Sequence, residues 1–264
     1  MGAVPSMVVF NDDIGDTAGK GGVLESQNDD IRFIDDDYLL NADGEDAGLM
    51  RDYDKILEEN DYLKKEIQYR VRSNLAIING VMNLEISSCD DERIKGILQD
   101  SMSRIISMSF AYENIYNSDD ISVFDMENFI RNLSHSFIEY YSPDSVISIN
   151  VDTKGLGIIA DDSVSFALVI NDLFIISLKH SLCGRSSGRI GIKSVRSDDG
   201  FVRIVFSDDG SGQGAGFDIK TSKLPEVCTV KSLVERYFEG ELNYNFAGNP
   251  EWEIVIPESK FNSS

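Results

Sequence analysis

The sequence predicts an α+β protein in which a long helical hairpin precedes an α/β-sandwich domain. Two observations favour this fold class. No proline occurs between Pro5 and Pro143, and apolar residues recur there at spacings of three and four, as in long amphipathic helices. Beyond Pro143, segments with alternating apolar residues are interleaved with helical segments, as in a layered domain. The predicted boundaries are an acidic segment over 1–50, the hairpin over 51–120, the sandwich domain over 121–258 and a tail over 259–264.

The N-terminal segment differs in composition from the rest of the chain. It contains acidic runs such as Asp35-Asp36-Asp37 and only two basic residues, Lys20 and Arg32. Such a composition predicts a solvated tail without a packed core. The alternative is an interaction arm, whose anchors would be the apolar residues within the acidic surroundings: Ile31, Phe33, Ile34, Tyr38, Leu39 and Leu40.

The hairpin is predicted from two apolar stripes on either side of the polar break Ser87-Ser88-Cys89-Asp90-Asp91. The stripes comprise Leu63, Ile67, Val71, Leu75, Ile78, Met82 and Ile86, and then Ile94, Leu98, Met102, Ile105, Met108, Tyr112 and Ile115. A single hairpin would leave much of both stripes in water. We therefore expect two copies to form a homodimeric four-helix bundle. The second helical region is expected to end at Ser118-Asp119-Asp120.

The sandwich domain is predicted from its own pattern of elements. Asp125 is a candidate N-cap for the helix that follows it, because its side chain can accept from the first free backbone N–H groups. The predicted helices are 124–140, 164–182 and 229–238, and the predicted strands are 146–152, 189–195, 201–206 and 252–256, with a turn at 197–200.

Composition excludes several function classes. The net charge of −22 and the pI near 4.3 argue against nucleic acid or an anionic membrane surface as a partner. No apolar run approaches the length of a membrane span, so we expect a soluble, cytoplasmic protein. The three cysteines Cys89, Cys183 and Cys228 lie far apart and far from both histidines, so no metal site is expected.

The stretch Glu66-Ile67-Gln68-Tyr69-Arg70-Val71-Arg72-Ser73-Asn74-Leu75 resembles the phosphoacceptor helix of sensor histidine kinases of the second dimerisation subgroup, which typically reads Glu-Ile-His-His-Arg-Val-Lys-Asn-Asn-Leu. Gln68 and Tyr69 replace the two histidines of that family. A neutral imidazole offers a lone pair at neutral pH, whereas a phenol is protonated there and a carboxamide is a poor nucleophile. The resemblance therefore implies no catalytic residue at this position and no autophosphorylation of the usual kind.

The second half resembles the ATP-binding domain of the same family. Asp208-Asp209-Gly210-Ser211-Gly212 matches the Asp-x-Gly-x-Gly box, in which the first Asp binds the adenine amino group; a tight acidic turn after a strand would look similar. The helix that begins at Asn171 resembles the family's Asn-Glu-Leu-x-x-Asn-Ala-x-Lys-His/Tyr motif. The resemblance thus implies a nucleotide site that includes Asn171, Lys179, Asp208, Gly210 and Gly212.

Two departures weaken this site. The asparagine that binds magnesium in the family falls at Ile176, which has no oxygen donor, so magnesium binding is doubtful. The glycine-rich lid would fall near 223–234, but no glycine occurs between Gly216 and Gly240. Glu226 would in addition repel a triphosphate. We expect ATP or ADP to bind weakly at best.

These observations lead to a histidine-kinase-like protein of two-component signalling that is catalytically degenerate. It is expected to act as a dimeric scaffold or regulator that docks a response regulator or a partner histidine kinase. One alternative is an active kinase or phosphotransferase with an unusual acceptor, for which Tyr69 and His135 are the candidates. Another is a sensor that binds nucleotide without turnover.

Overall fold

The computed structural model describes residues 7–10, 44–117, 123–142, 144–213, 217–246 and 248–261. The chain divides into two compact units, one of residues 13–70 and one of residues 1–12 and 71–264. Helix α1 (Gly44–Ser88) contributes residues to both units. The anchors of the predicted interaction arm and the helix end at 118–120 lie outside the described residues.

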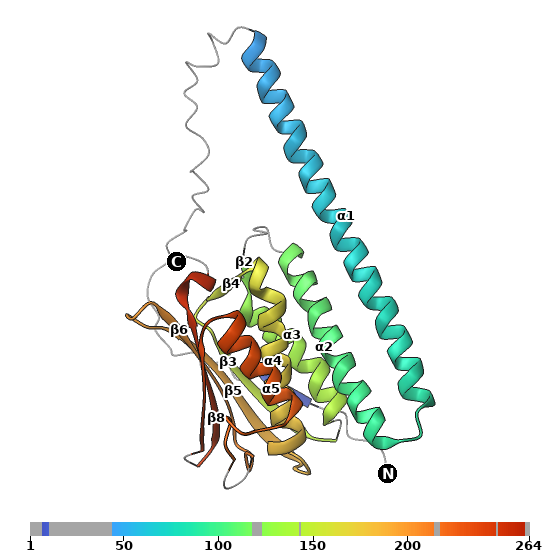
Figure 1. Cartoon of the computed structure of the whole chain (residues 1–264), viewed down its shortest axis with the longest axis vertical. Helices are drawn as coiled ribbons and strands as arrows, with labels where there is room; N and C mark the ends of the chain where they lie inside the picture. Colours follow the sequence, from blue (N-terminus) through green and yellow to red (C-terminus); the bar gives the residue numbers. More distant parts are fainter. Residues whose placement is uncertain are drawn as a thin grey trace. The chain divides into compact units, whose positions relative to one another are not determined.

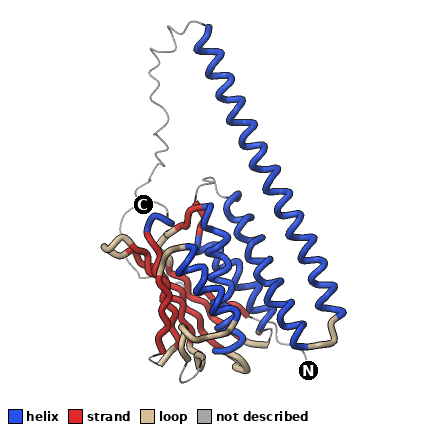
Figure 2. Tube along the Cα trace, in the orientation of Figure 1, coloured by secondary structure: helices blue, strands red, loops and turns tan. Residues whose placement is uncertain are grey.

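Helix α2 (Glu92–Asn117) follows α1 after a connection of three residues, Cys89 to Asp91 (Figures 1 and 2). The Asp91 carboxylate accepts hydrogen bonds from the backbone N–H groups of Arg93 and Ile94, at 2.9 and 3.2 Å, and so caps the new helix. An ion pair of 3.1 Å joins Arg72 of α1 to Glu113 of α2. The two helices are therefore antiparallel, as the break at 87–91 predicts.

A six-stranded mixed sheet forms the framework of the sandwich domain, in the order β1-β3-β5-β6-β8-β7. Its strands are β1 (Met7–Phe10), β3 (Val146–Asp152), β5 (Ser187–Arg196), β6 (Phe201–Asp208), β7 (Glu241–Phe246) and β8 (Pro250–Pro257). The pairs β1–β3 and β3–β5 are parallel and the others are antiparallel. A separate two-stranded ribbon joins β2 (Val123–Asp125) to β4 (Gly157–Ile159).

Three helices pack with this sheet: α3 (Met126–Tyr141), α4 (Ser163–Ile176) and α5 (Pro225–Ser232) (Figure 1). Helices α4 and α5 each continue into a π-helical turn, Ser177–Ser181 and Leu233–Tyr237. Buried and more exposed residues alternate along β3, β5 and β6, the pattern of a sheet with one face against a core. The core between sheet and helices contains fully buried aromatic side chains: Phe129, Phe166, Phe174, Phe206 and Trp252.

The predicted fold class is confirmed, and most predicted elements are present. Asp125 caps α3 through a 3.0 Å hydrogen bond from the Asn128 backbone N–H, as predicted. Helix α5 begins at Pro225, four residues before the predicted start. Strand β7 was not predicted, because its sequence at the edge of the sheet is largely polar.

Both ends of the chain differ from the prediction. Met7–Phe10, expected in a solvated tail, pairs as β1 with β3, and α1 begins at Gly44 rather than near residue 51. At the other end Phe261 is buried and bridges to Ile158, although 259–264 was expected to be a tail. Short apolar runs inside a charged segment give too weak a pattern to predict such packing from sequence.

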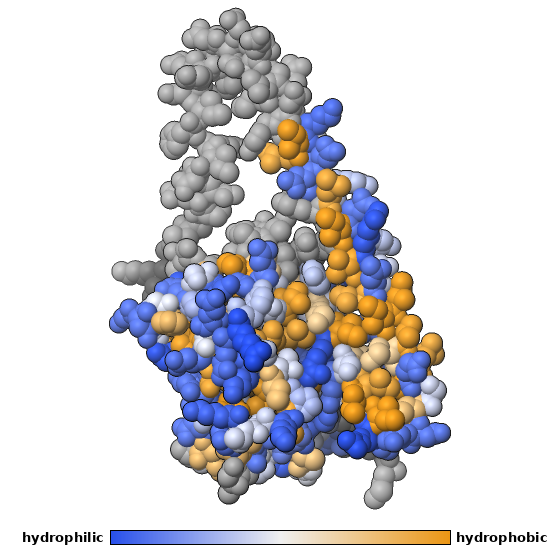
Figure 3. Space-filling model, in the orientation of Figure 1, coloured by the Kyte–Doolittle hydropathy of each residue, from blue (hydrophilic) through white to orange (hydrophobic). Residues whose placement is uncertain are grey.

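The predicted apolar stripes of the hairpin behave unequally. Ile86 and Met102 are buried, and Val71, Leu75 and Met82 are half-buried. Other stripe residues are exposed, namely Leu63, Ile67, Ile78 and Ile94, and so are apolar residues outside the predicted stripes: Ile77, Val81, Leu84 and Ile97. Figure 3 shows apolar side chains gathered along this end of the hairpin. Within the part of the chain that the structure describes, none of the helices combines the length and apolar character needed to span a bilayer.

Candidate functional site

The residues of the predicted nucleotide site come from two places that the fold brings together. Asn171 and Asp172 lie on α4, and Lys179 and His180 lie on the π-helical turn after it. Asp208 ends β6, and the glycines of its motif follow in the next loop. Hydrogen bonds between these segments confirm that they are neighbours: Ser211 N donates to the Ser181 carbonyl at 3.0 Å.

The Asp208 carboxylate is buried and accepts three hydrogen bonds. One oxygen accepts from the Ser177 hydroxyl at 2.8 Å, and the other accepts from the Ser181 hydroxyl and from the Gly210 backbone N–H. Burial raises the pKa of Asp208 above its ordinary value, although these three donors oppose the shift. The protein itself therefore supplies most donors to the acceptor that the family uses for adenine, and Oδ2 keeps one lone pair for a further donor.

The glycines of the motif are explained by close packing. A Cβ at Gly210 would collide with the backbone and hydroxyl of Ser181. Gly212 has a φ of +61°, and a Cβ there would lie 2.7 Å from the Tyr244 hydroxyl. Glycine is therefore required at both positions by packing within the protein: Gly210 lies against the turn after α4 and Gly212 lies against β7.

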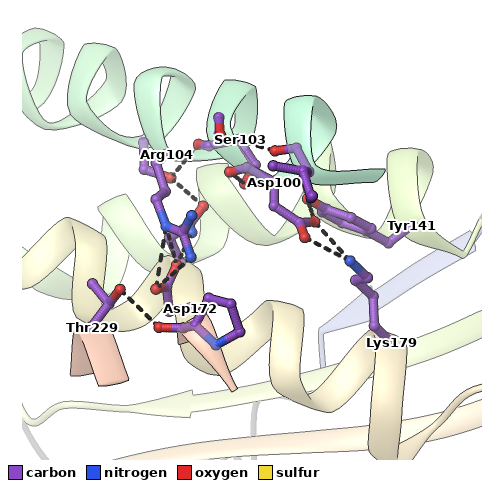
Figure 4. A network of polar contacts seen from close by, with 12 residues as sticks. Asp100, Ser103, Arg104, Tyr141, Asp172, Lys179 and Thr229 are labelled. Atoms are coloured by element: carbon purple, nitrogen blue, oxygen red, sulfur yellow. Dashed lines mark hydrogen bonds and ion pairs between the residues drawn. The ribbon is translucent and has the colours of Figure 1, made fainter. Parts of the chain in front are cut away.

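Helix α2 contacts the polar side chains at the centre of α4. Arg104 makes a two-pronged ion pair with Asp172, with Nε–Oδ1 and Nη2–Oδ2 distances of 2.9 Å. The Ser107 hydroxyl donates to Asn171 Oδ1 at 2.9 Å, and the Asn171 amide donates to Asp172 at 2.6 Å. The two residues that open the predicted nucleotide motif are thus bound by α2 of the same chain. Figure 4 shows the pair of Arg104 and Asp172.

One helical turn earlier on α2, Asp100 binds the other end of the motif. Lys179 Nζ lies 2.9 and 2.7 Å from the two carboxylate oxygens of Asp100, and the Tyr141 hydroxyl donates to the same carboxylate at 3.1 Å (Figure 4). Burial raises the pKa of Tyr141, so its phenol stays protonated and acts as a donor. We refer to Asp100, Arg104, Ser107, Tyr141, Asn171, Asp172 and Lys179 together as the α2–α4 polar network.

The electrostatics of this network depend on pairing. Burial raises the pKa of the inaccessible Asp172 carboxyl, against the hydrogen bonds and charge of Arg104. Burial alone would lower the pKa of Arg104, but its hydrogen bonds to Asp172 and the nearby carboxylates raise it. Asp172 and Arg104 are also influenced by the charge of Glu226, which is itself buried and has one carboxylate oxygen without a hydrogen-bond partner among the described residues.

The remaining positions of the motif supply no ligand in place of the asparagine that binds magnesium in the family. Ile176 is buried in the apolar core, so no oxygen donor is present there. Burial lowers the pKa of His180, whose Nε2 has no hydrogen-bond partner among the described residues. Across the described ranges, no group of three His, Cys, Asp or Glu side chains is arranged to hold a metal ion.

Where the family places its glycine-rich lid, this chain forms a helix. Leu224 precedes α5, Pro225 is at its start, and Glu226 in the first turn is buried. Proline at the first helical position removes a backbone N–H that could otherwise face a phosphate. The segment therefore packs on α4 as a regular helix.

Tyr69, at the family's phosphoacceptor position, lies on α1 in the unit of residues 13–70, and 73% of its surface is exposed. The neighbouring Arg70 pairs with Glu66 one turn earlier. Gln68 is in the same helix. The other candidate acceptor, His135, is exposed on α3, off the buried face that holds Phe129 and Leu133, as its spacing predicts.

Sequence reasoning missed the α2 side of the network. Asp100 and Arg104 are four residues apart and off the predicted apolar stripe, a pattern that is usually a solvated helix face. The only signal was complementary charge. Asp100 is opposite in charge to its partner Lys179, and Arg104 is opposite in charge to its partner Asp172. That complementarity cannot be recognised until the two helices are known to be adjacent.

Comparisons with known proteins agree with this architecture. A family model described as histidine kinase, HisKA_2, matches residues 66–141. The sensor histidine kinases PdtaS of Mycolicibacterium smegmatis and of Mycobacterium tuberculosis are each 24% identical to the chain over 205 residues. The match covers 77% of this chain and 40% of each relative, so the chain spans less than half the length of these proteins.

Among solved structures, the chain is similar to the histidine kinase domain of the Erythrobacter litoralis EL346 blue-light activated histidine kinase. The TM-score is 0.54 at 19% identity, over 76% of this chain and 94% of that one. A second structure, of the EL346 kinase, gives a TM-score of 0.56 at 20% identity, over 75% of this chain and 60% of that one. At these identities the similarity establishes the fold.

Proposed function

Because this chain is a sensor-histidine-kinase-like protein, we propose that it acts in two-component signalling as a dimeric regulator that does not phosphorylate itself. In this proposal the hairpin docks a response regulator or a partner histidine kinase. The sandwich domain holds the hairpin in place as a scaffold. Three features support the proposal: the acceptor position, the state of the nucleotide-site residues and the exposed apolar face of the hairpin.

The observation that most strongly supports a non-catalytic role is the α2–α4 polar network. Asn171, Asp172 and Lys179 would have to face a nucleotide in an active site, but each already binds a side chain of α2. Removing a partner from a buried ion pair costs about 3–5 kcal/mol. A nucleotide would have to offset that cost before gaining any contact with these residues.

The phosphate end of the site is unfavourable as well. Glu226 is 5% exposed and its charge acts on Arg104 and Asp172, so it would oppose a triphosphate at this place. Ile176 supplies no ligand for the magnesium that neutralises phosphate charge in kinases. Tyr69 at the acceptor position is a weak nucleophile at neutral pH.

The adenine end is better preserved, which favours residual binding of the base as a second candidate function. Asp208 and the glycines of its motif are in place. Oδ1 of Asp208 is occupied by Ser181 and Gly210, whereas Oδ2 accepts from Ser177 and can take one further donor. We therefore expect ATP and ADP to bind about equally, with a Kd of roughly 0.1 mM or weaker, about −5.5 kcal/mol. Magnesium should change this affinity little.

A dimer is supported by a heptad register along α1. Exposed apolar residues fall on one seam at spacings of three, four and their sums: Ile56, Leu63, Ile67, Ile77, Val81 and Leu84. Asn60 and Asn74 fall in the same register. Such a seam is typical of helices that pair side by side, and a polar residue within it selects a single register. The seam shares Leu63 and Ile67 with the stripe predicted from sequence, whereas Ile86 of that stripe is buried within the chain.

Calorimetric titration with ATP and ADP, each with and without magnesium, tests the proposed loss of nucleotide chemistry. Weak binding that is insensitive to magnesium and is abolished in Asp208→Ala is expected, because the variant removes the remaining acceptor for the adenine amino group. Asp198→Ala, on an exposed turn, is the matched control and should bind like the unchanged protein. Micromolar affinity that requires magnesium would return the chain to the class of active kinases.

A further inference from the structure

A cavity of about 370 Å³ lies beside α5, and none of the residues of the α2–α4 polar network lines it. Its walls come from the loop before α5, from the outer face of the helix and from the π-helical turn after it. Helix residues Cys228, Lys231 and Glu235 recur at the spacing of one helical face. None of the residues predicted for the nucleotide site lines this cavity.

The charge of the walls is the opposite of the charge of the chain. Lys220, Lys231 and Arg236 face the cavity with Glu235 as the single carboxylate, whereas acidic residues outnumber basic ones by 46 to 24 in the whole sequence. Among the described residues, these three cationic side chains have no ion pair or hydrogen bond. Lys231 is half-buried and still unpaired. The cavity is therefore a place of net positive charge with unused donors.

The cavity also has apolar walls. Val227 is buried at its base and Ile219 is half-buried beside it. A volume of about 370 Å³ falls within the range typical of small-molecule sites, which combine apolar walls with a few placed polar groups. Water alone would solvate the cations, but it would leave the apolar walls unfavourably exposed to solvent.

We propose that this cavity binds a small molecule in which a phosphate monoester is attached to a compact apolar body. Three cations and one carboxylate match the charge of about −2 that a phosphate monoester has near neutral pH. The Arg236 guanidinium provides the planar pair of donors that suits phosphate oxygens, and the lysines provide point charges. Ile219 and Val227 contact the apolar body. The site is independent of the proposed regulatory function.

Cys228 makes the proposal directly testable, because its thiol lines the cavity and donates only to the Ser222 carbonyl, at 3.6 Å. In a Cys89→Ser/Cys183→Ser variant it is the only thiol left. The rate at which its thiolate displaces iodide from iodoacetamide is measured by mass spectrometry, with phenyl phosphate as the probe ligand and sodium chloride at matched ionic strength. A bound anion covers the thiol and disfavours the thiolate.

About 10 mM phenyl phosphate is expected to slow the modification roughly fivefold, as for a Kd of a few millimolar, and inorganic phosphate should slow it less. Lys231→Gln and Arg236→Gln should each remove the protection. Lys193→Gln, an exposed lysine on β5 outside the cavity, should retain it. An unchanged rate with phenyl phosphate, equal protection by uncharged phenol, or protection that persists in both cavity variants would each overturn the proposal.

Discussion

Single residues of the candidate site were predictable where they belong to a short sequence motif. Asp208, Gly210 and Gly212 fall within five consecutive residues, although Asp208 and Gly210 both contact Ser181, which lies well before them in the chain. Asn171 and Lys179 were found by the same kind of local pattern. What they bind was not predictable, since Ser107 and Asp100 lie 64 and 79 residues earlier in the chain.

At the acceptor position, Tyr69→His alone is expected to give no incorporation of the γ-phosphate of ATP. The change supplies a nucleophile, but Ile176, Glu226 and the occupied Asp172 still oppose the binding of a magnesium-bound triphosphate. Radiolabelled ATP followed by acid and alkali treatment checks this, because phosphohistidine is acid-labile and phosphotyrosine is stable. Strong acid-labile label in the variant would limit the degeneracy to the acceptor, and stable label on the unchanged protein would make Tyr69 the acceptor.

The raised pKa of Asp208 predicts a pH dependence of stability. Between the ordinary value of 3.8 and the raised value, the folded protein retains a proton that the unfolded chain has lost. The stabilisation is therefore complete at low pH and is lost as the pH rises through the folded-state pKa. Relative to Asp208→Asn, the free energy of unfolding of the unchanged protein should fall by about 1.4 kcal/mol per pH unit inside that window. Outside the window, the two curves of unfolding free energy against pH should run parallel.

Denaturant titrations from about pH 3 to about pH 7 measure this difference. Asp198→Asn, at an exposed turn, provides the control and should follow the unchanged protein throughout. Parallel curves for Asp208→Asn and the unchanged protein over the whole range would show that Asp208 titrates normally.

Among the elements, α2 has the most consequential position. One of its faces carries the hairpin's apolar residues, and another binds α4 through Arg104 and Asp100. The sequence predicted the element from its apolar stripe and its start from the polar break at 87–91, because both are local signals. The second role depends on packing against an element far along the chain, and no local signal reports it.

Removing one partner of the Arg104–Asp172 pair should lower the unfolding free energy more than replacing both partners by apolar residues. Arg104→Ala leaves the inaccessible Asp172 carboxylate unpaired and is expected to cost about 3 kcal/mol of unfolding free energy. Arg104→Met combined with Asp172→Leu replaces the pair by apolar side chains and should recover most of that loss. Urea titration with a constant m value measures both effects.

Arg203→Ala is the matched control for this comparison, since Arg203 pairs with Asp199 and Glu253 at the surface. Exposed pairs contribute little, so a change within about 0.5 kcal/mol is expected there. An Arg104→Ala variant as stable as Arg203→Ala would show that α2 is not held to α4 by this pair.

At the scale of the whole molecule, the exposed seam of α1 predicts assembly. Val81→Asp places a charge where a second copy is expected to pack, and should convert the dimer into a monomer at micromolar concentration. The monomer should keep its secondary structure, because Val81 is 53% exposed within one chain. Sedimentation equilibrium together with circular dichroism measures both properties.

Val195→Asp changes an equally exposed valine on β5, outside the hairpin, and should leave the dimer intact. An unchanged protein that sediments as a monomer at these concentrations would contradict the prediction that the seam is a dimer interface. A Val81→Asp variant that remains a dimer would show that the dimer interface lies on another surface.

Strand β1 has a consequence for how the protein can be handled. Met7–Phe10 occupies the outer side of β3 and satisfies its backbone N–H and C=O groups along four residue pairs. Deleting those few residues would turn β3 into an open sheet border of alternating apolar residues, which is a template for strand addition between molecules. A shortened chain that begins at the first long helix should therefore fold and yet self-associate into sheet-linked aggregates.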